Sequence, residues 1–299
     1  MKVSKNKLNV VLDIGKTNVK LIFLKHDKIV KEYKTKQQNG SYKNSIKILK
    51  SDQIVIWLIK KLKKESKINT LENFVCTTHG CSLAFIDFDN KEIIACTDYE
   101  YSFNKFKEEF LKTKPAFSTS FTPLLEGGLN TGLQIFYLSK RFPNILKKTK
   151  YILSYPQYVS WKLSQTYSTE ITYVGCHSYL WDFKKNKFSQ LTKKLSVEKK
   201  FPPMKKAWDV IGGFKLNNKK INILNGVHDS NASYLYFLKS NLKSFTLVST
   251  GTWYITLNQQ TNIKKLKPHY DMLCGINVFG KSVPTMRFMG GREYELLCK

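Results

Sequence analysis

The fold is decided by the stretch Leu8-Asn-Val-Val-Leu-Asp-Ile-Gly-Lys-Thr-Asn-Val-Lys20. The apolar run at residues 10–12 has the length and β-branched content of a buried strand, and a second apolar run at residues 19–24 follows a short turn. Gly15 frees the backbone for that turn. The stretch predicts a β-hairpin whose turn can offer N–H groups to phosphate oxygens, while Asp13 holds a hydrated cation. An ordinary hairpin turn explains the same residues equally well.

A second stretch far downstream repeats this pattern. Residues 244–257 read Ser-Phe-Thr-Leu-Val-Ser-Thr-Gly-Thr-Trp-Tyr-Ile-Thr-Leu, which predicts two strands joined by a Thr-Gly-Thr turn. Two such hairpins suggest a nucleotide held between two related lobes. Between them, Asn225-Gly-Val-His-Asp-Ser-Asn-Ala232 follows an apolar run and leads into an apolar helix. On these residues alone, Asp229 is best explained as a helix-capping aspartate.

The rest of the chain alternates between strand and helix patterns. Helices are predicted at residues 51–65, with Ser51 as N-cap, at 130–141 and within 145–163. Strands are predicted at residues 71–77, 82–87 and 92–96, and residues 117–129 and 201–213 read as irregular connections. This alternation is typical of an α/β lobe with a mixed sheet.

Composition indicates a folded protein. Hydrophobic residues make up 42% of the 299 positions and aromatic residues 13%. No apolar run approaches the roughly 18–20 residues of a membrane span, and Asp13 interrupts the first one, so we expect neither a membrane anchor nor a signal peptide. The six cysteines form no Cys-x-x-Cys pair. We therefore expect reduced thiols in a cytoplasmic protein.

The net charge of +28 comes almost entirely from lysine, because the chain has three arginines, at positions 141, 287 and 292. Proteins that read nucleic acids rely on arginine for bidentate contacts. The lysines are also spread along the whole chain. We therefore favour solvated lysine-rich faces over a nucleic-acid site, although the positive field would attract an anionic nucleotide.

Taken together, the motifs resemble those of the FGGY carbohydrate kinases, a branch of the sugar kinase/Hsp70/actin superfamily. The resemblance rests on the pair Asp13-Ile-Gly-Lys-Thr-Asn and Ser249-Thr-Gly-Thr-Trp, and on residues 226–232, which are similar to the family's catalytic-aspartate segment. It extends in order along nearly the whole chain and is strongest to rhamnulokinase- and fuculokinase-related members. The further motifs are Thr78-His-Gly80, Asp98-Tyr-Glu100, Gly175-Cys-His177, Leu180-Trp-Asp182 and Arg287-Phe-Met-Gly-Gly-Arg-Glu293.

The resemblance implies an α/β fold with a ribonuclease H-like (actin-like ATPase) lobe on a mixed sheet, followed by an incomplete second lobe of the same type. Residues 1–240 would form the sugar-binding N-terminal domain, and residues 241–299 the start of the ATP-binding C-terminal domain. The implied reaction transfers the γ-phosphoryl group of ATP, with Mg²⁺, to a hydroxyl of a ketose or related sugar. A 6-deoxyketose such as rhamnulose or fuculose is the first expectation.

The resemblance also assigns roles to individual residues. Asp229 would be the general base, and Asp13 would organise Mg²⁺ through water. The two turns would hold the nucleotide phosphates, and their residues are Gly15, Thr17, Asn18, Thr250, Gly251 and Thr252. The sugar would contact Thr78, His79, Gly80, Asp98, Gln134, His177, Trp181 and His228.

For several of these sugar-site residues the sequence leaves a structural alternative open. His79 and His177 also fit as locally bonded turn histidines, and Asp98 as a polar strand end. Gln134 fits equally well as a solvated helix residue and Trp181 as a core residue.

The chain is shorter than the FGGY kinases it resembles, which carry their adenine-binding glycine-rich stretch later in the sequence. We expect a fragment, a truncated gene product or one half of a split kinase whose missing lobe is on a separate chain. A non-catalytic sugar-binding remnant is the alternative function. A homodimer is a further open arrangement.

Overall fold

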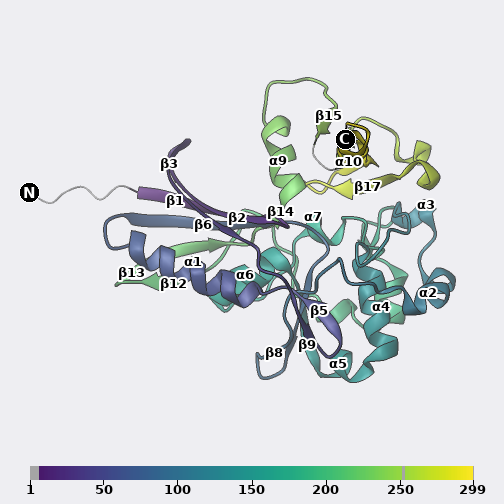
Figure 1. Cartoon of the computed structure of the whole chain (residues 1–299), viewed down its shortest axis with the longest axis horizontal. Helices are drawn as coiled ribbons and strands as arrows, with labels where there is room; N and C mark the ends of the chain where they lie inside the picture. Colours follow the sequence, from purple (N-terminus) through teal and green to yellow (C-terminus); the bar gives the residue numbers. More distant parts are fainter. Residues whose placement is uncertain (1–6, 251–252, 299) are drawn as a thin grey trace, which may run out of the picture.

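The predicted hairpin lies near the middle of a seven-stranded mixed sheet in the computed structural model, which describes residues 7–250 and 253–298 (Figure 1). β1 pairs antiparallel with β2, β2 pairs antiparallel with β3, and β1 runs parallel to β6 on its other side. The buried residues of β1 and β2 alternate, as expected for strands with one covered face. These four strands are β1 (Lys7–Ile14), β2 (Asn18–Lys25), β3 (Lys28–Lys36) and β6 (Thr70–Thr78).

Three later strands extend the sheet beyond β6: β12 (Val210–Leu216), β13 (Lys219–Leu224) and β14 (Val227–His228). β13 and β14 run parallel to β6 one after the other, and β12 pairs antiparallel with β13. Between β13 and β14, Gly226 has φ +91°, and a Cβ there would lie 2.7 Å from the carbonyl oxygen of Cys76. Glycine is therefore required where the strand breaks. The strand resumes with His228 beside Thr78.

Two helices pack against this sheet: α1 (Ser51–Glu65) and α6 (Tyr155–Ser164) (Figure 1). Ile54, Leu58 and Leu62 are buried at a spacing of four residues, which places them on one face of α1. The predicted N-cap at Ser51 is wrong. Ser51 is already inside the helix, and the capping position falls on Lys50, which makes no side-chain cap bond.

The remainder of the first lobe surrounds a three-stranded antiparallel sheet of order β8-β7-β9. The strands of this sheet are β7 (Leu83–Asp87), β8 (Glu92–Ile94) and β9 (Thr149–Ser154). The lobe also contains two small hairpins. One joins β4 (Ser41–Lys43) to β5 (Ile46–Ile48), and the other joins β10 (Trp181–Asp182) to β11 (Lys187–Phe188). Its helices are η1 (Asn104–Phe106), α2 (Lys107–Thr113), α3 (Phe117–Ser120), α4 (Thr131–Arg141), α5 (Pro143–Lys148), α7 (Ile171–Val174), α8 (Gln190–Lys194) and η2 (Glu198–Lys200).

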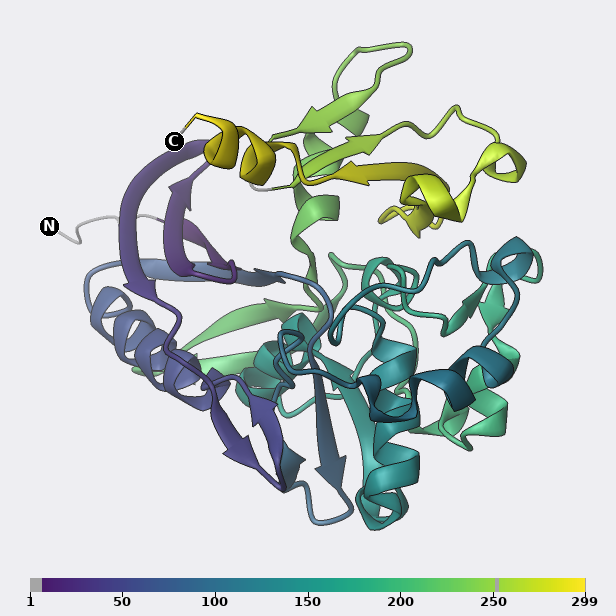
Figure 2. The ribbon, with the colours of Figure 1, turned by 45° about the vertical axis from the view of Figure 1, so that its right-hand side comes forward.

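The second lobe is a four-stranded antiparallel sheet of order β15-β16-β18-β17 that lies above the first lobe in Figures 1 and 2. Several contacts attach it. The Cys274 N–H donates to the carbonyl oxygen of Phe121 at 2.9 Å, Ile276 packs so close to Gly175 that a Cβ there would lie 2.6 Å away, and the Phe279 ring lies 5.7 Å from that of Trp208. Its elements are α9 (Asp229–Leu238), β15 (Leu247–Ser249), β16 (Tyr254–Leu257), η3 (Ile263–Lys265), η4 (Pro268–Tyr270), β17 (Met272–Ile276), β18 (Ser282–Phe288) and α10 (Gly290–Leu297).

The two faces of this second sheet have different surroundings. A sheet without covering helices would leave Leu247, Trp253 and Ile255 exposed, but all three are partly buried. The exposed apolar side chains lie elsewhere on the sheet and on α10, and include Val248, Tyr254, Met286, Phe288, Tyr294 and Leu297. In residues 7–250 and 253–298, no helix is long and apolar enough to cross a bilayer.

Candidate active site

Three strand ends bring the two key carboxylates to one edge of the main sheet. Asp13 on β1 is in register with Thr77 on β6, which is in register with Val227 on β14. Because neighbouring strands lie about 4.8 Å apart, Asp13 is about 10 Å across the sheet from Val227. Asp229 follows two residues later, at the first position of α9. The topology therefore brings together residues that are more than 200 positions apart in the sequence.

The two carboxylates influence each other electrostatically. Burial raises the pKa of Asp13, the negative charge of Asp229 raises it further, and Lys20 acts in the opposite direction. Burial also raises the pKa of Asp229, against the hydrogen bonds from Ser230 and the nearby His79. A carboxylate whose proton affinity is raised by a second carboxylate nearby forms with it a natural site for a cation or for a proton.

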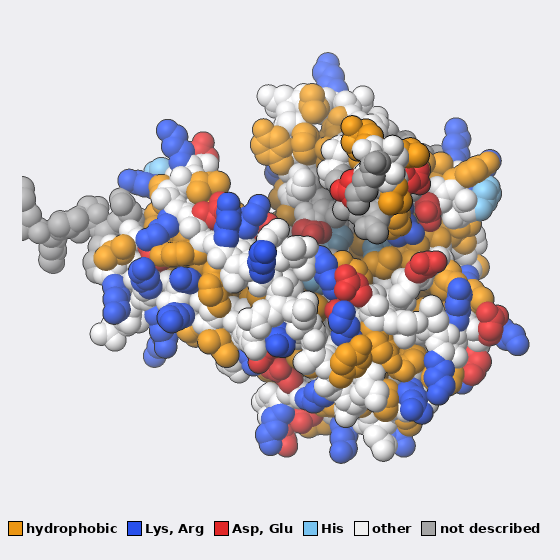
Figure 3. Space-filling model, viewed as in Figure 1, with side chains coloured by type: hydrophobic (Ala, Val, Ile, Leu, Met, Phe, Trp, Pro, Cys, Tyr) orange, Lys and Arg blue, Asp and Glu red, His pale blue; other side chains and the backbone are white. Residues whose placement is uncertain are grey.

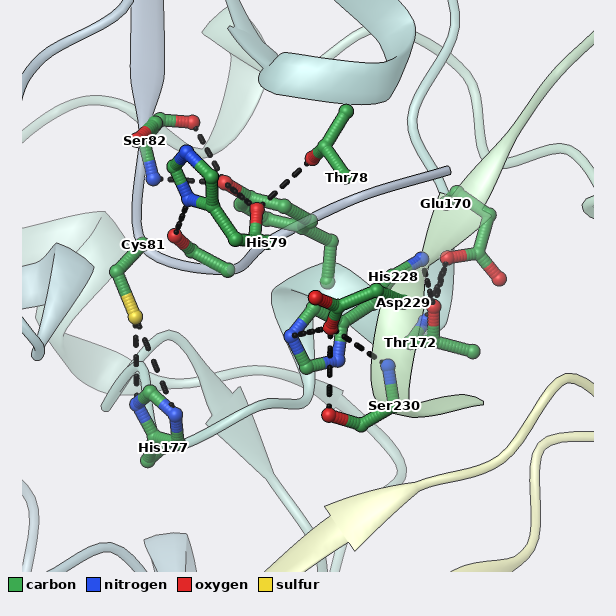
Figure 4. A network of polar contacts seen from close by, with 12 residues as sticks. Thr78, His79, Cys81, Ser82, Glu170, Thr172, His177, His228, Asp229 and Ser230 are labelled. Carbon is green, nitrogen blue, oxygen red and sulfur yellow. Dashed lines mark hydrogen bonds and ion pairs between the residues drawn. The ribbon is translucent and has the colours of Figure 1, made fainter. Parts of the chain in front are cut away.

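Asp229 is held by its immediate neighbours (Figure 4). Its Oδ1 accepts the backbone N–H of Ser230 at 2.6 Å and the Ser230 hydroxyl at 3.3 Å. The Nε2 of His228 lies 3.3 Å from the same oxygen, and the Asp229 side chain remains 37% exposed. The carboxylate is thus fixed at one oxygen and open to the space in front of it.

That space is a cavity of about 380 Å³ between the two lobes, a volume that suits a small metabolite. Figure 3 shows the furrow between the lobes, with histidine and acidic side chains at its bottom. The wall from the first lobe and α9 consists of His79, Gly80, Cys81, Tyr99, Leu129, Cys176, His177, His228, Asp229, Ser230 and Asn231. The wall from the second sheet consists of Trp253, Ile255, Leu257, Leu273, Gly275, Ile276, Val283, Thr285 and Arg287.

The cavity histidines are neutral and accept hydrogen bonds. The Nδ1 of His79 lies 2.9 Å from the Gly80 carbonyl, and the Nδ1 of His177 lies 2.8 Å from the Leu129 carbonyl. Because a carbonyl only accepts, each Nδ1 carries the proton and each Nε2 is an acceptor. The His79 Nε2 is buried and has no protein partner in the described part of the chain. Burial lowers the pKa of His79, and it lowers the pKa of His177 and of His228 to about 4.

Gly80 is needed for the position of the His228 ring. A Cβ at Gly80 would lie 2.8 Å from the Nε2 of His228, closer than side chains approach in practice. The His228 ring also packs edge-on against Tyr173, with ring centroids 5.8 Å apart. The glycine of the Thr-His-Gly motif therefore makes room for the histidine that contacts Asp229.

Asp98 was predicted to contact the sugar, and the structure places it in an ion-pair cluster. Lys16 and Lys47 both bind its carboxylate, the latter at 3.0 Å, and both also reach Glu100. Burial alone would raise the pKa of Asp98, but the hydrogen bonds from Lys16, from the Glu100 N–H and from Lys47 outweigh it and lower the pKa. Asp98 does not line the cavity, but Tyr99 does.

Three other predicted sugar-site residues do not line the cavity. Gln134 is fully buried and donates to the carbonyl oxygens of Cys81, at 2.7 Å, and Gly128, while it accepts from a threonine hydroxyl. Thr78 is fully buried and donates to the His79 carbonyl at 2.8 Å. Gln134 and Thr78 therefore support the cavity residues Cys81 and His79 from behind. Trp181 packs edge-on against an aromatic side chain of β11.

The described residues of the two predicted phosphate turns do not line this cavity. Thr17 and Asn18 are exposed, but the N–H of Gly15 is committed to the Asn18 carbonyl at 2.9 Å. In the second turn Thr250 is exposed. The predictions for Gly251 and Thr252 lie outside the described residues.

Sequence reasoning missed several cavity residues. Cys81 lies beside His177, with its Sγ 3.7 Å from the Nδ1. Arg287 lies over the Trp253 ring at 4.7 Å and 3.3 Å from an Asp271 carboxylate oxygen. Arg287 belonged to a motif noted in the sequence, but its direction towards the cavity depends on the strand pairing of β18 with β16.

The site offers few ligands for a tightly bound metal. The described residues contain no cluster of three or more His, Cys, Asp or Glu side chains that could hold an ion. Asp13 alone fits a magnesium ion that keeps most of its water and shares substrate phosphates. The mutual repulsion of Asp13 and Asp229 would be relieved by such a cation.

Comparison with known proteins agrees with the geometry. Residues 242–299 match the family described as carbohydrate kinase FGGY, C-terminal domain. No curated protein sequence matches the chain. A carbohydrate kinase from Novosphingobium aromaticivorans has a similar structure, with a TM-score of 0.91 and 28% identity over 98% of this chain and 65% of that chain.

More distant sugar kinases share the fold. A xylulose kinase from Lactobacillus acidophilus has a TM-score of 0.76 and 13% identity over 93% of this chain and 59% of its own. Plasmodium falciparum glycerol kinase, solved with ADP, has a TM-score of 0.78 and 14% identity over 97% and 63%. The chain spans less than two thirds of the length of each of these three structures. The predicted α/β, actin-like ATPase fold is confirmed, whereas the rhamnulokinase and fuculokinase branch stays a prediction.

Proposed function

We propose that the chain carries the sugar-binding domain, residues 1–240, and the first part of the ATP-binding domain, residues 241–299, of a carbohydrate kinase. The observation that carries the proposal is that the sheet brings Asp13 near Asp229, which lines a cavity of about 380 Å³. The similarity to a carbohydrate kinase over 98% of the chain supports it. The six unpaired cysteines suit a cytoplasmic enzyme.

Asp229 acts as the general base. It accepts the proton of the sugar hydroxyl that attacks phosphorus, and its raised pKa makes it a stronger base than an ordinary aspartate. ATP would supply the γ-phosphoryl group, and Mg²⁺ would neutralise its charge. Asp13 would hold this ion through water. The phosphates rest on the two turns through Gly15, Thr17, Asn18, Thr250, Gly251 and Thr252.

The sugar lies in the cavity, with its hydroxyls directed at the first lobe. His79, Gly80, His177 and His228 line this wall, and the Nε2 atoms of His79 and His177 are acceptors for the hydroxyl protons. Thr78, Asp98, Gln134 and Trp181 hold the wall in shape. Our preferred substrate is a ketose, and a 6-deoxyketose in particular, because most side chains of the opposite wall are apolar.

Exchange of Asp229 tests the proposal. We expect Asp229→Asn to lower turnover of ATP with the preferred sugar by roughly 10²–10⁴-fold, while sugar binding persists. Asp27→Asn, in an exposed turn, removes the same charge away from the cavity and serves as control. Assays should cover a panel of ketoses and polyols. Retained turnover in Asp229→Asn would remove the general base from the proposal, and sugar-induced melting shifts without ATP consumption would favour a non-catalytic sugar-binding protein.

The exposed apolar face of the second sheet is the candidate surface for a partner. We propose that the rest of an ATP-binding lobe packs on Val248, Tyr254, Met286 and Phe288, which are 36–52% exposed. Sedimentation of the chain alone distinguishes this from a homodimer, because a dimer that covers the same face would sediment at twice the monomer mass.

A further inference from the structure

A buried carboxylate lies directly behind the catalytic segment. Glu170 is fully buried at the N-cap of α7, and its Oε2 accepts both the backbone N–H of Thr172, at 2.9 Å, and the Thr172 hydroxyl (Figure 4). Its Oε1 is also buried and has no protein partner in the described residues. Burying a carboxyl group that is only half satisfied is costly, so this arrangement calls for an explanation.

Helix capping alone does not explain why a carboxyl group is buried at position 170. A four-residue helix needs little stabilisation, and α8 of the same lobe is capped by the hydroxyl of Ser189, which accepts the N–H of Leu191. A serine at position 170 would give the same cap without a buried carboxyl group. Glu170 differs from such a serine in its second hydrogen bond. Its carboxyl group accepts a hydrogen bond from the Thr172 hydroxyl and so fixes the direction of that O–H.

With its proton turned towards Glu170, the Thr172 hydroxyl has its lone pairs free to accept. It accepts the backbone N–H of His228 at 3.2 Å. His228 is the residue immediately before Asp229, and its ring contacts the Asp229 carboxylate. The chain of bonds therefore runs from Glu170 through Thr172 to the main chain that presents Asp229.

We propose that Glu170 and Thr172 are positioning residues that set the orientation of Asp229. The inference rests on the proposed kinase function, in which Asp229 is the base, and it adds two residues that touch neither substrate. Tyr173 follows Thr172 on α7, and its hydroxyl accepts the Ser82 N–H at 2.6 Å. Helix α7 therefore contacts both the 79–82 loop and β14.

The same geometry predicts a dependence on pH. Burial raises the pKa of Glu170 to about 8, against hydrogen bonds from Thr172 and Tyr173, so the group is protonated at neutral pH. Tyr173, His228 and Asp229 are titratable groups of the adjoining segments. Burial raises the pKa of Tyr173 and lowers the pKa of His228, so both stay neutral between pH 6 and 9. Above pH 8 Glu170 ionises while its buried Oε1 has no protein partner in the described residues, so we expect the segment around Thr172 to relax and turnover to fall.

Four variants test the proposal. Thr172→Val removes the hydroxyl at nearly constant volume and should lower kcat at least tenfold with little change in KM, whereas Thr172→Ser should restore it. Thr169→Val is the matched control, because Thr169 is equally buried and its hydroxyl bonds the Pro202 carbonyl, away from His228. Glu170→Gln should keep turnover at pH 7 and lose the decline above pH 8.

Amide hydrogen exchange of His228 gives a readout that needs no turnover. Exchange should be faster in Thr172→Val than in Thr169→Val, and the pKa of Asp229 measured by carbon NMR should move towards 3.8. Equal kcat, exchange and pKa in these two variants would overturn the positioning role. Turnover retained in Asp229→Asn would instead overturn the kinase mechanism, while the NMR comparison still decides whether Thr172 holds this segment.

Discussion

Gly80→Ala is the sharpest test of the site geometry. The new methyl group would lie 2.8 Å from the His228 Nε2 and 3.3 Å from its Cδ2, whereas ordinary contact begins near 3.4 Å. The ring must therefore retreat by about 0.6 Å, although it is packed against Tyr173 and bound to Asp229. Turning a packed ring away from its rotamer costs about 0.5–1.5 kcal/mol. We expect a fall in Tm of about 1–5 °C.

The effect on activity should be larger than the effect on stability. A misplacement of about 1 Å near reacting groups costs on the order of 10²-fold in rate, so a shift of the ring that contacts Asp229 should lower kcat at least tenfold. Gly275→Ala is the control for stability, because a methyl group there meets nothing closer than 4.0 Å. Differential scanning fluorimetry and coupled ATP assays measure both quantities. If Gly80→Ala matches Gly275→Ala in Tm and keeps wild-type kcat, the absence of a side chain at position 80 is not needed to position the His228 ring.

Two further predictions concern stability and pH. The pKa of Glu170 is about 8 in the folded protein and 4.5 in its ordinary range, so between these values the folded state holds a proton that the unfolded state has lost. The wild type therefore loses stability relative to Glu170→Gln as pH rises from 4.5 through 8. Urea unfolding should show a difference that grows by roughly 3–5 kcal/mol between pH 5 and pH 9, and a constant difference would contradict the raised pKa. Asp98→Asn should destabilise by roughly 1–3 kcal/mol at pH 7, since it leaves two partly exposed lysines with the more exposed Glu100 as their shared carboxylate. Because the pKa of Asp98 is lowered, that loss should disappear as pH falls below the ordinary aspartate range, and a loss that persists at pH 2.5 would point to packing instead.

Local patterns in the sequence were sufficient for most of the secondary structure. The hairpin at β1 and β2, helix α1 and strand β6 follow directly from apolar periodicity and turn residues. Strand β12 was missed, because Gly212 and Gly213 looked like a connection. Both glycines are tolerated there because β12 lies at the edge of the sheet and is supported by pairing with β13 alone.

The candidate site was predicted less completely than the fold. Motifs located Asp13, His79 and Asp229 by position, but the ion pair between Lys16 and Asp98 joins residues 82 positions apart. No local pattern distinguishes a sugar-binding aspartate from one that is neutralised by lysines. The role of a polar side chain depends on which partners the topology brings to it, and that information is absent from any short stretch.

The chemistry of the cavity walls narrows the ligand further than the motifs do. The first-lobe wall carries acceptors, namely the Asp229 carboxylate and imidazole nitrogens that burial keeps neutral, so a ligand must bring hydrogen-bond donors to it. The opposite wall has Thr285 and Arg287 as polar side chains but is mostly apolar, with Ile255, Leu257, Leu273 and Val283. A hydroxyl of a fully hydroxylated sugar that faces this apolar part would be left unpaired. A polyol with one hydrocarbon end satisfies both walls, because its hydroxyls meet the acceptors and its methyl group meets the sheet. If the kinase proposal holds, a 6-deoxyketose should therefore bind more tightly than the corresponding ketose that has a hydroxyl at carbon 6.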